Sequence, residues 1–262
     1  MESPPVLPWL LGCAALTETP IAPVELNALG AVSRTLAQPH LPDNLLPRAA
    51  ALIPQLIALL RQTDLPTPAI AERIGKDSVL SAEVMRLASS PYYRAQGEVG
   101  DLEQAINRIG LHGLETVIAR VLLKPIYGAA PGPLSARVGP RMWDHSEALA
   151  RHVAILANAS GQPVFDAYVA GILHDTGWTI ALNIIDRAGL QLPVPPSQAF
   201  GAALTEHAHR LFGLAARRWD ITPGFTTLAQ DARDNGMQAA SHPLGLLLRQ
   251  AQQPCLEELA ST

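Results

Sequence analysis

The sequence predicts an all-α fold of two packed helical parts, and three observations support this prediction. Aromatic residues make up only 5% of the 262 residues, whereas Ala and Leu are frequent, a composition that favours helices over sheets. Apolar residues recur at helical spacing in successive segments, which Gly and Pro residues separate. No segment alternates apolar and polar residues convincingly, as a half-buried strand would.

Composition also narrows the class of protein. Hydrophobic residues account for 48% of the chain and charged residues for 16%, as in a globular protein with a substantial core. The net charge of −4 does not favour nucleic-acid binding, which needs a basic face. No apolar run approaches the roughly 20 residues that span a bilayer. The two cysteines, Cys13 and Cys255, suit a reducing compartment, so we expect a cytoplasmic protein without a membrane partner.

The first 45 residues are expected to form a Pro-rich N-terminal extension, with one weak helix over residues 24–36. The main domain is expected over residues 46–255, where the strong periodicity begins. Removing the extension should therefore leave a folded core, unless apolar side chains near its start dock on the body. These side chains are Val6, Leu7, Trp9 and Leu10.

The first half of the main domain, residues 46–127, is predicted to contain five short helices. They cover about residues 52–60, 67–75, 77–90, 101–110 and 114–126. Thr67, Asp77 and Asp101 stand where N-cap residues are expected, because their side chains can accept hydrogen bonds from free backbone N–H groups. Gly110 is expected at the C′ position that ends the fourth helix.

The second half, residues 140–255, follows a segment rich in Gly and Pro at residues 128–133, which is a linker by composition. Six further helices are predicted beyond it. They cover about residues 141–159, 165–174, 177–188, 197–218, 223–234 and 243–253.

The residues most suggestive of chemistry are His174 and Asp175, an adjacent pair at a helix end that Gly177 follows two residues later. An imidazole nitrogen and a carboxylate oxygen together suit a divalent metal that activates water or binds phosphate. His145 lies upstream on a helix, and a helix–turn–helix return could bring it to the pair. A structural reading is equally open: His174 could simply end one helix and Asp175 cap the next, since buried polar groups usually serve the structure.

Several segments resemble the HDOD family, whose members are related to HD metal-dependent phosphohydrolases. The matching segments are Leu46-Pro47, Leu59-Leu60, residues 70–77, 85–93, 105–111, 143–146, 171–177, 206–213 and 219–223. The resemblance spans about residues 46–253. It implies two helical subdomains forming one unit, with the second half HD-like, and the role of an output domain in bacterial signal transduction.

The resemblance also implies a metal site, and the sequence departs from it. His145, His174 and Asp175 match metal ligands of HD proteins, but the closing aspartate of a later helix falls at Gln252, a neutral amide. We therefore expect vestigial ligands without metal, no catalytic residues and no cofactor. Any metal still bound would be a divalent cation such as Mn, Fe or Mg. The alternative is a metal-dependent phosphohydrolase acting on a nucleotide or cyclic dinucleotide.

The expected partner is another signalling protein or a small ligand, bound in the cleft between the two halves, where pockets commonly form. Nucleic acid is not expected, and the sequence does not predict the oligomeric state. His207 and His209 are two residues apart on one helix, so they face different directions. We expect one to be packed and the other exposed, and one of them can approach the vestigial site.

Overall fold

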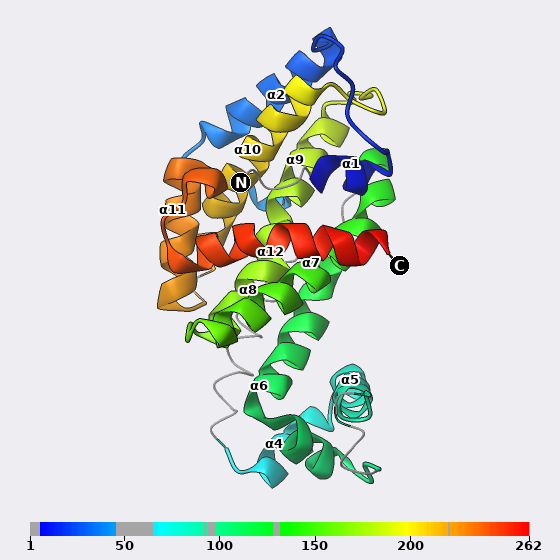
Figure 1. Cartoon of the computed structure of the whole chain (residues 1–262), viewed down its shortest axis with the longest axis vertical. Helices are drawn as coiled ribbons and strands as arrows, with labels where there is room; N and C mark the ends of the chain where they lie inside the picture. The colour runs from blue at the N-terminus through cyan, green and yellow to red at the C-terminus, as the bar shows by residue number, and fades with distance from the viewer. Residues whose placement is uncertain are drawn as a thin grey trace. The chain divides into compact units, whose positions relative to one another are not determined.

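The computed structural model describes residues 6–45, 65–91, 93, 98–127, 132–219 and 221–261. Within these ranges the regular structure is α-helix with short 3₁₀ turns, and an isolated bridge between Thr17 and Ser197 is the only β-type pairing (Figure 1). The all-α prediction is confirmed. The predicted helix over residues 52–60 lies outside the described residues.

The chain divides into two compact units. One contains residues 1–48 and 126–262, and the other contains residues 49–125. Both ends of the chain thus belong to the first unit, which we call the major unit; the second is the minor unit. The boundary predicted at residue 46 between an extension and the main domain stays a prediction.

The minor unit contains α4 (Thr67–Ile74), α5 (Ser78–Ala88) and α6 (Leu102–Leu123), with η3 (Lys124–Ile126) following α6 in the chain. The side chains of Asp77 and Asp101 accept backbone N–H bonds at the starts of α5 and α6, so both predicted caps are confirmed. The predicted cap at Thr67 is wrong. Pro66 occupies that position, and the Thr67 hydroxyl instead donates to Asn107 on α6.

Gly110 lies inside α6 with φ of +69°, where the helix bends sharply. Because a residue with a side chain rarely adopts this backbone conformation, glycine is the residue that permits the break. The structure therefore has the two helical segments that were predicted on either side of Gly110, joined directly instead of by a loop.

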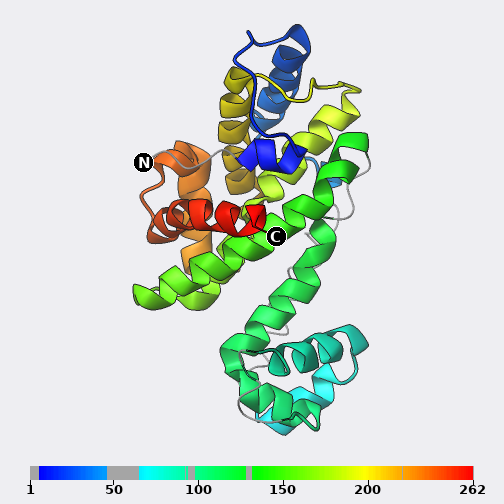
Figure 2. The ribbon, with the colours of Figure 1, turned by 45° about the vertical axis from the view of Figure 1, so that its right-hand side comes forward.

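The major unit holds nine described helical elements. They are α1 (Val6–Leu11), α2 (Pro23–Leu36), η1 (Asp43–Leu45), α7 (Pro133–Ala159), α8 (Val164–His174), α9 (Thr176–Arg187), α10 (Gln198–Ala216), α11 (Pro223–Ala239) and α12 (Pro243–Ala260). Figure 2 shows α2 running beside α10 and α12 lying across α7, as their contacts also indicate. Ten consecutive residues of α9, Thr176–Ile185, are buried, so this helix lies at the centre of the unit's core.

Helix α7 begins well before the predicted start at residue 141. The carboxylate of Asp186, on α9, accepts hydrogen bonds from the backbone N–H groups of Leu134 (3.0 Å) and Ser135 (2.8 Å). It therefore caps the helix from a distant part of the chain, and Pro133 occupies the first turn, where its missing N–H costs little. Helices α11 and α12 also run further than predicted, α11 by continuing past a bend at Gly236.

The N-terminal residues pack onto the major unit. Val6, Leu7, Leu10 and Leu11 of α1 are buried, and α1 contacts α7. Side chains from later in the chain hold residues 41–45, since Asn183 of α9 donates to the carbonyl of Leu45 and Arg218 donates to the carbonyl of Leu41. The sequence-based expectation of an irregular segment before residue 24 missed α1. Among the described helices, none is both long and apolar enough to cross a membrane.

Candidate functional site

Asp175 stands at the junction of α8 and α9, and its side chain is fully buried. The junction is tight: the Thr176 hydroxyl donates to the carbonyl of Leu173 (2.6 Å), and the backbone N–H of Thr179 donates to the carbonyl of Asp175 (3.1 Å). A carboxylate in such a place must be hydrogen-bonded, because an unpaired buried charge is costly. Its partners therefore define the site.

Helix α7 supplies two of these partners. One oxygen of Asp175, Oδ2, accepts hydrogen bonds from His145 Nδ1 (2.5 Å) and from the Ser146 hydroxyl (2.9 Å). The other, Oδ1, accepts from Nδ1 of the neighbouring His174 (3.0 Å). The structure thus brings together the three residues predicted as vestigial ligands. Gly171 permits this approach of α8 to α7, since a Cβ there would lie 2.5 Å from Ala150 Cα.

Helix α12 adds Gln252, whose Nε2 lies 2.9 Å from His145 Nε2. In the neutral ring this nitrogen accepts a hydrogen bond from the amide. When the ring is protonated it becomes a donor, and the amide can turn its oxygen toward it. Gln252 thus satisfies His145 in either protonation state. We call His145, Ser146, His174, Asp175 and Gln252 the His–Asp cluster.

The cluster strongly shifts the pKa values of its central pair. Burial alone would lower the pKa of His145, but the charge of Asp175 and its hydrogen bond outweigh burial and raise that pKa to about 10. Burial alone would raise the pKa of Asp175, but the charge and hydrogen bond of His145 and the contact with His174 hold it below its usual range. The pair is therefore most stable as imidazolium and carboxylate.

Helix α10 brings His209 beside the cluster, with ring centroids of His209 and His174 5.4 Å apart. Gly177 makes this possible, because a Cβ there would lie 1.9 Å from the backbone oxygen of Ala208. Burial, followed by the neighbouring His174, lowers the pKa of His209 to about 3, so the ring is neutral at pH 7. His207 is half-buried and hydrogen-bonded to Ser33, so of the two histidines it is His209 that is packed and near the cluster.

The cluster does not fit a metal ion. Both ring nitrogens of His145 already have partners, and Asp175 accepts three hydrogen bonds. Among residues 6–261 so far as they are described, no group of three or more His, Cys, Asp and Glu side chains is arranged to hold one. Gln252, where a carboxylate would be needed, offers only a neutral amide. That the protein carries no metal stays a prediction.

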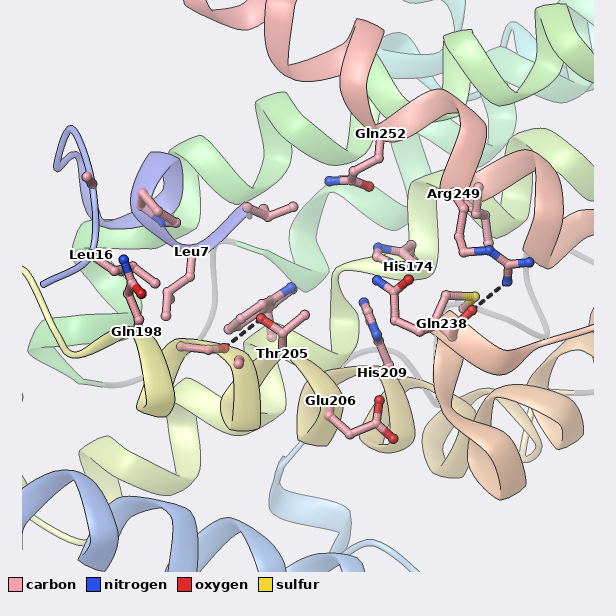
Figure 3. A pocket seen from close by; sticks show the side chains of 18 of the residues that line it. Leu7, Leu16, His174, Gln198, Thr205, Glu206, His209, Gln238, Arg249 and Gln252 are labelled. Carbon is pink, nitrogen blue, oxygen red and sulfur yellow. Dashed lines mark hydrogen bonds between the residues drawn. The ribbon is translucent and has the colours of Figure 1, made fainter. Parts of the chain in front are cut away.

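A cavity of about 780 Å³ opens beside the cluster, within the major unit (Figure 3). His174, His209 and Gln252 reach it from the cluster side, and Leu7 and Leu16 line its opposite side. The sequence-based hypothesis placed ligand binding between the two halves, whereas this cavity is built by the major unit alone. The sequence indicated that apolar side chains near residue 6 can dock on the body, but no local pattern shows that they line a cavity.

The structure is that of an all-α protein with a buried His–Asp pair. The HDOD domain family matches residues 46–230, which is more than half of the sequence. The chain belongs to the HDOD family.

Relatives of this chain are distant. An uncharacterised protein of Treponema pallidum (strain Nichols) is 21% identical over 193 residues, which are 70% of this chain and 35% of the relative. The chain thus spans about a third of the length of this curated relative.

Solved structures share the fold. An HDOD domain protein of unknown function from Geobacter sulfurreducens has a TM-score of 0.57 at 21% identity, covering 88% of this chain and 78% of its own. A candidate phosphohydrolase from Shewanella amazonensis SB2B has a TM-score of 0.57 at 23% identity, covering 88% and 81%. A candidate signal transduction protein from Marinobacter aquaeolei VT8 has a TM-score of 0.58 at 18% identity, covering 91% and 55%.

Proposed function

We propose that this chain is a bacterial regulatory module of signal transduction that acts by binding and does not hydrolyse phosphate esters. The observation that supports this most directly is the His–Asp cluster. Its imidazole and carboxylate groups bond to one another, to Ser146 and to Gln252, so they serve as a structural network. Metal-assisted hydrolysis needs the same atoms as ligands, with an open position for water.

The two cysteines also support this proposal. The free thiols Cys13 and Cys255 suit the reducing cytoplasm, where signalling modules of this family would work. A module that acts by binding needs a partner, and we propose a small ligand or another signalling protein.

Metal analysis tests the proposal. We expect the protein, purified from cells grown with added Mn and Fe, to carry no stoichiometric metal. We also expect it to show no metal-dependent hydrolysis of bis(p-nitrophenyl) phosphate or cyclic di-GMP, because the cluster lacks its closing carboxylate. One or more metal equivalents per chain, together with turnover, would contradict the proposal and support a phosphohydrolase.

The variant Gln252→Asp sharpens this test. It restores a carboxylate next to His145, and we expect it to gain affinity for Mn²⁺ in equilibrium dialysis. Gln253→Asp is the matched control, since Gln253 is exposed on the same helix and bonds to Glu257. The control should bind no more metal than the unmodified protein.

A further inference from the structure

The cavity beside the His–Asp cluster has walls of two kinds. Helices α10, α11 and α12 form one side, and the N-terminal segment 6–16 forms the other. At about 780 Å³ it has the size of sites that hold small molecules. Figure 3 shows Leu7 and Leu16 of the N-terminal segment facing the space above α10, with Thr205 on that helix.

Two buried polar groups on the lining have no hydrogen-bond partner among the described residues. They are Nδ1 of His209 and the indole N–H of Trp178. His209 is 7% exposed, and Figure 3 shows its ring pointing from α10 toward His174. Buried polar groups are nearly always hydrogen-bonded, so an unpaired imidazole at a cavity wall suggests that a ligand supplies the missing partner.

The charged side chains of the lining, Arg249 and Glu206, carry opposite charges and leave the cavity without a net positive charge. Arg249 already donates to the carbonyls of Met237 (2.6 Å) and Ala240 (2.9 Å), and Glu206 is paired with Arg210 (2.7 Å). A phosphate group would therefore meet no excess of positive charge to balance it, which is costly in an apolar site.

The remaining lining is apolar or neutral. Its apolar part consists of Val6, Leu7, Pro8, Ala14, Ala15, Leu16, Trp178, Gly201, Ala202, Met237 and Leu248. The side chains of Gln198, Gln238 and Gln252 add neutral amides. Such a lining suits a molecule with an apolar body and one or two uncharged hydrogen-bonding groups.

We propose that this cavity binds an uncharged, largely apolar small molecule that carries a carbonyl or similar group, which hydrogen-bonds near His209, and that segment 6–16 contacts it as one wall. The inference rests on the proposed function, since it names the ligand class of a module that acts by binding.

Segment 6–16 is attached to the body in a way that lets a bound ligand change how readily it opens. Thr17 is anchored to the body by backbone bonds, from its N–H to the Pro196 carbonyl (2.9 Å) and from the Gln198 N–H to its own carbonyl (2.8 Å). Before that anchor, α1 has only six residues, and its attachment is mainly apolar burial. A short helix held this way opens more readily than the core, so a ligand in the cavity should slow its opening.

The test uses the full chain and the neutral fluorophore Prodan, which has a naphthalene body and a ketone. We expect saturable binding with a blue shift of its emission. Ala202→Trp should abolish it, because Ala202 is an exposed α10 residue at the cavity. Ala199→Trp is the matched control: Ala199 is also exposed on α10 but does not line the cavity, so binding should persist.

A second variant tests the hydrogen bond. His209→Leu should weaken Prodan binding by roughly threefold to tenfold, as expected for one lost hydrogen bond. It should leave 2-dimethylaminonaphthalene, which has no ketone, nearly unaffected. Circular dichroism checks that each variant is folded. If His209→Leu is misfolded, the comparison of Ala202→Trp with Ala199→Trp decides whether Prodan binds in the cavity.

Hydrogen exchange tests the wall. Saturating Prodan should slow amide exchange in residues 6–16 more than in α4 of the minor unit. Three results would overturn the inference: no saturable binding, equal binding by both Trp variants, or tighter binding of the anionic dye ANS than of Prodan. None of these bears on metal content or hydrolysis, so the proposed function would stand or fall separately.

Discussion

At the scale of single residues, Gln252 and Asp175 determine what His145 can do. The carboxylate holds one ring nitrogen and the amide holds the other, so the imidazole is fixed in orientation and has no free nitrogen. The sequence predicted that Gln252 would replace a carboxylate and that these residues would meet. It could not show that the amide would complete a hydrogen-bonded network, because that depends on the approach of α12 to α7.

Because His145 and Asp175 form a buried ion pair, we predict that the stability of the protein falls at alkaline pH. The pKa of His145 is about 10 in the folded protein and near 6.5 when unfolded, so the folded state holds its proton more tightly. The resulting stabilisation is complete below pH 6.5 and is lost as pH rises through about 10. The free energy of unfolding, from urea denaturation, should therefore decrease over this window.

Comparison with variants isolates this effect. Asp175→Asn removes the charge that raises the pKa of His145, so the stability gap between this variant and the unmodified protein should be widest near pH 6 and narrow toward pH 10. His112→Asn is the control, since this side chain is 78% exposed and lies in the minor unit. A gap that stays constant with pH would show that His145 is neutral in the folded protein.

At the scale of helices, glycines set how closely the elements around the cluster approach. Gly171 lets α8 meet α7, and Gly177 lets α9 meet α10. The sequence predicted most helices of the chain, since caps such as Asp77 and breaks such as Gly110 are local signals. It did not predict the start of α7, because its cap, Asp186, comes from another helix.

The change Gly177→Ala should destabilise the protein by about 1–3 kcal/mol or more, the usual cost of overpacking. The added Cβ would collide with backbone atoms of α10, which cannot turn aside as a side chain would. The matched control is Gly30→Ala in the middle of α2, where a Cβ would meet only the end of Arg34, 3.5 Å away. That change should stabilise the helix by roughly 0.5–1 kcal/mol. If thermal melts showed Gly177→Ala to be more stable than Gly30→Ala, the close approach of α9 to α10 would be contradicted.

At the scale of the whole molecule, the N-terminal segment belongs to the same compact unit as the C-terminal helices. The sequence left this open, because α1 has only six residues, too few to show clear periodicity. Four apolar side chains were noted as able to dock, and three of them, Val6, Leu7 and Leu10, are buried. Their burial depends on the surface of the distant helices, which no local pattern reveals.

Leu10→Ala should therefore lower the free energy of unfolding by about 2–5 kcal/mol, as for other leucines truncated in a core. Leu10 is 0% exposed, whereas Leu26 on α2 is 54% exposed. Leu26→Ala is therefore a control that should change the free energy of unfolding by only a few tenths of a kcal/mol. Equal melting temperatures for Leu10→Ala and the unmodified protein would show that the packing of α1 does not stabilise the major unit.

The composition of the cavity wall has a consequence for biosynthesis. Residues 6–16 are translated before α10 and α12, the helices that complete the cavity they line. At about 5–20 residues per second, residues 6–16 wait on the order of 10–50 seconds until α10 and α12 have been translated. During that interval Leu7 and Leu10 are exposed on the nascent chain, where a chaperone can hold them. A polypeptide released before Gln252 is translated would lack part of the cavity that residues 6–16 line.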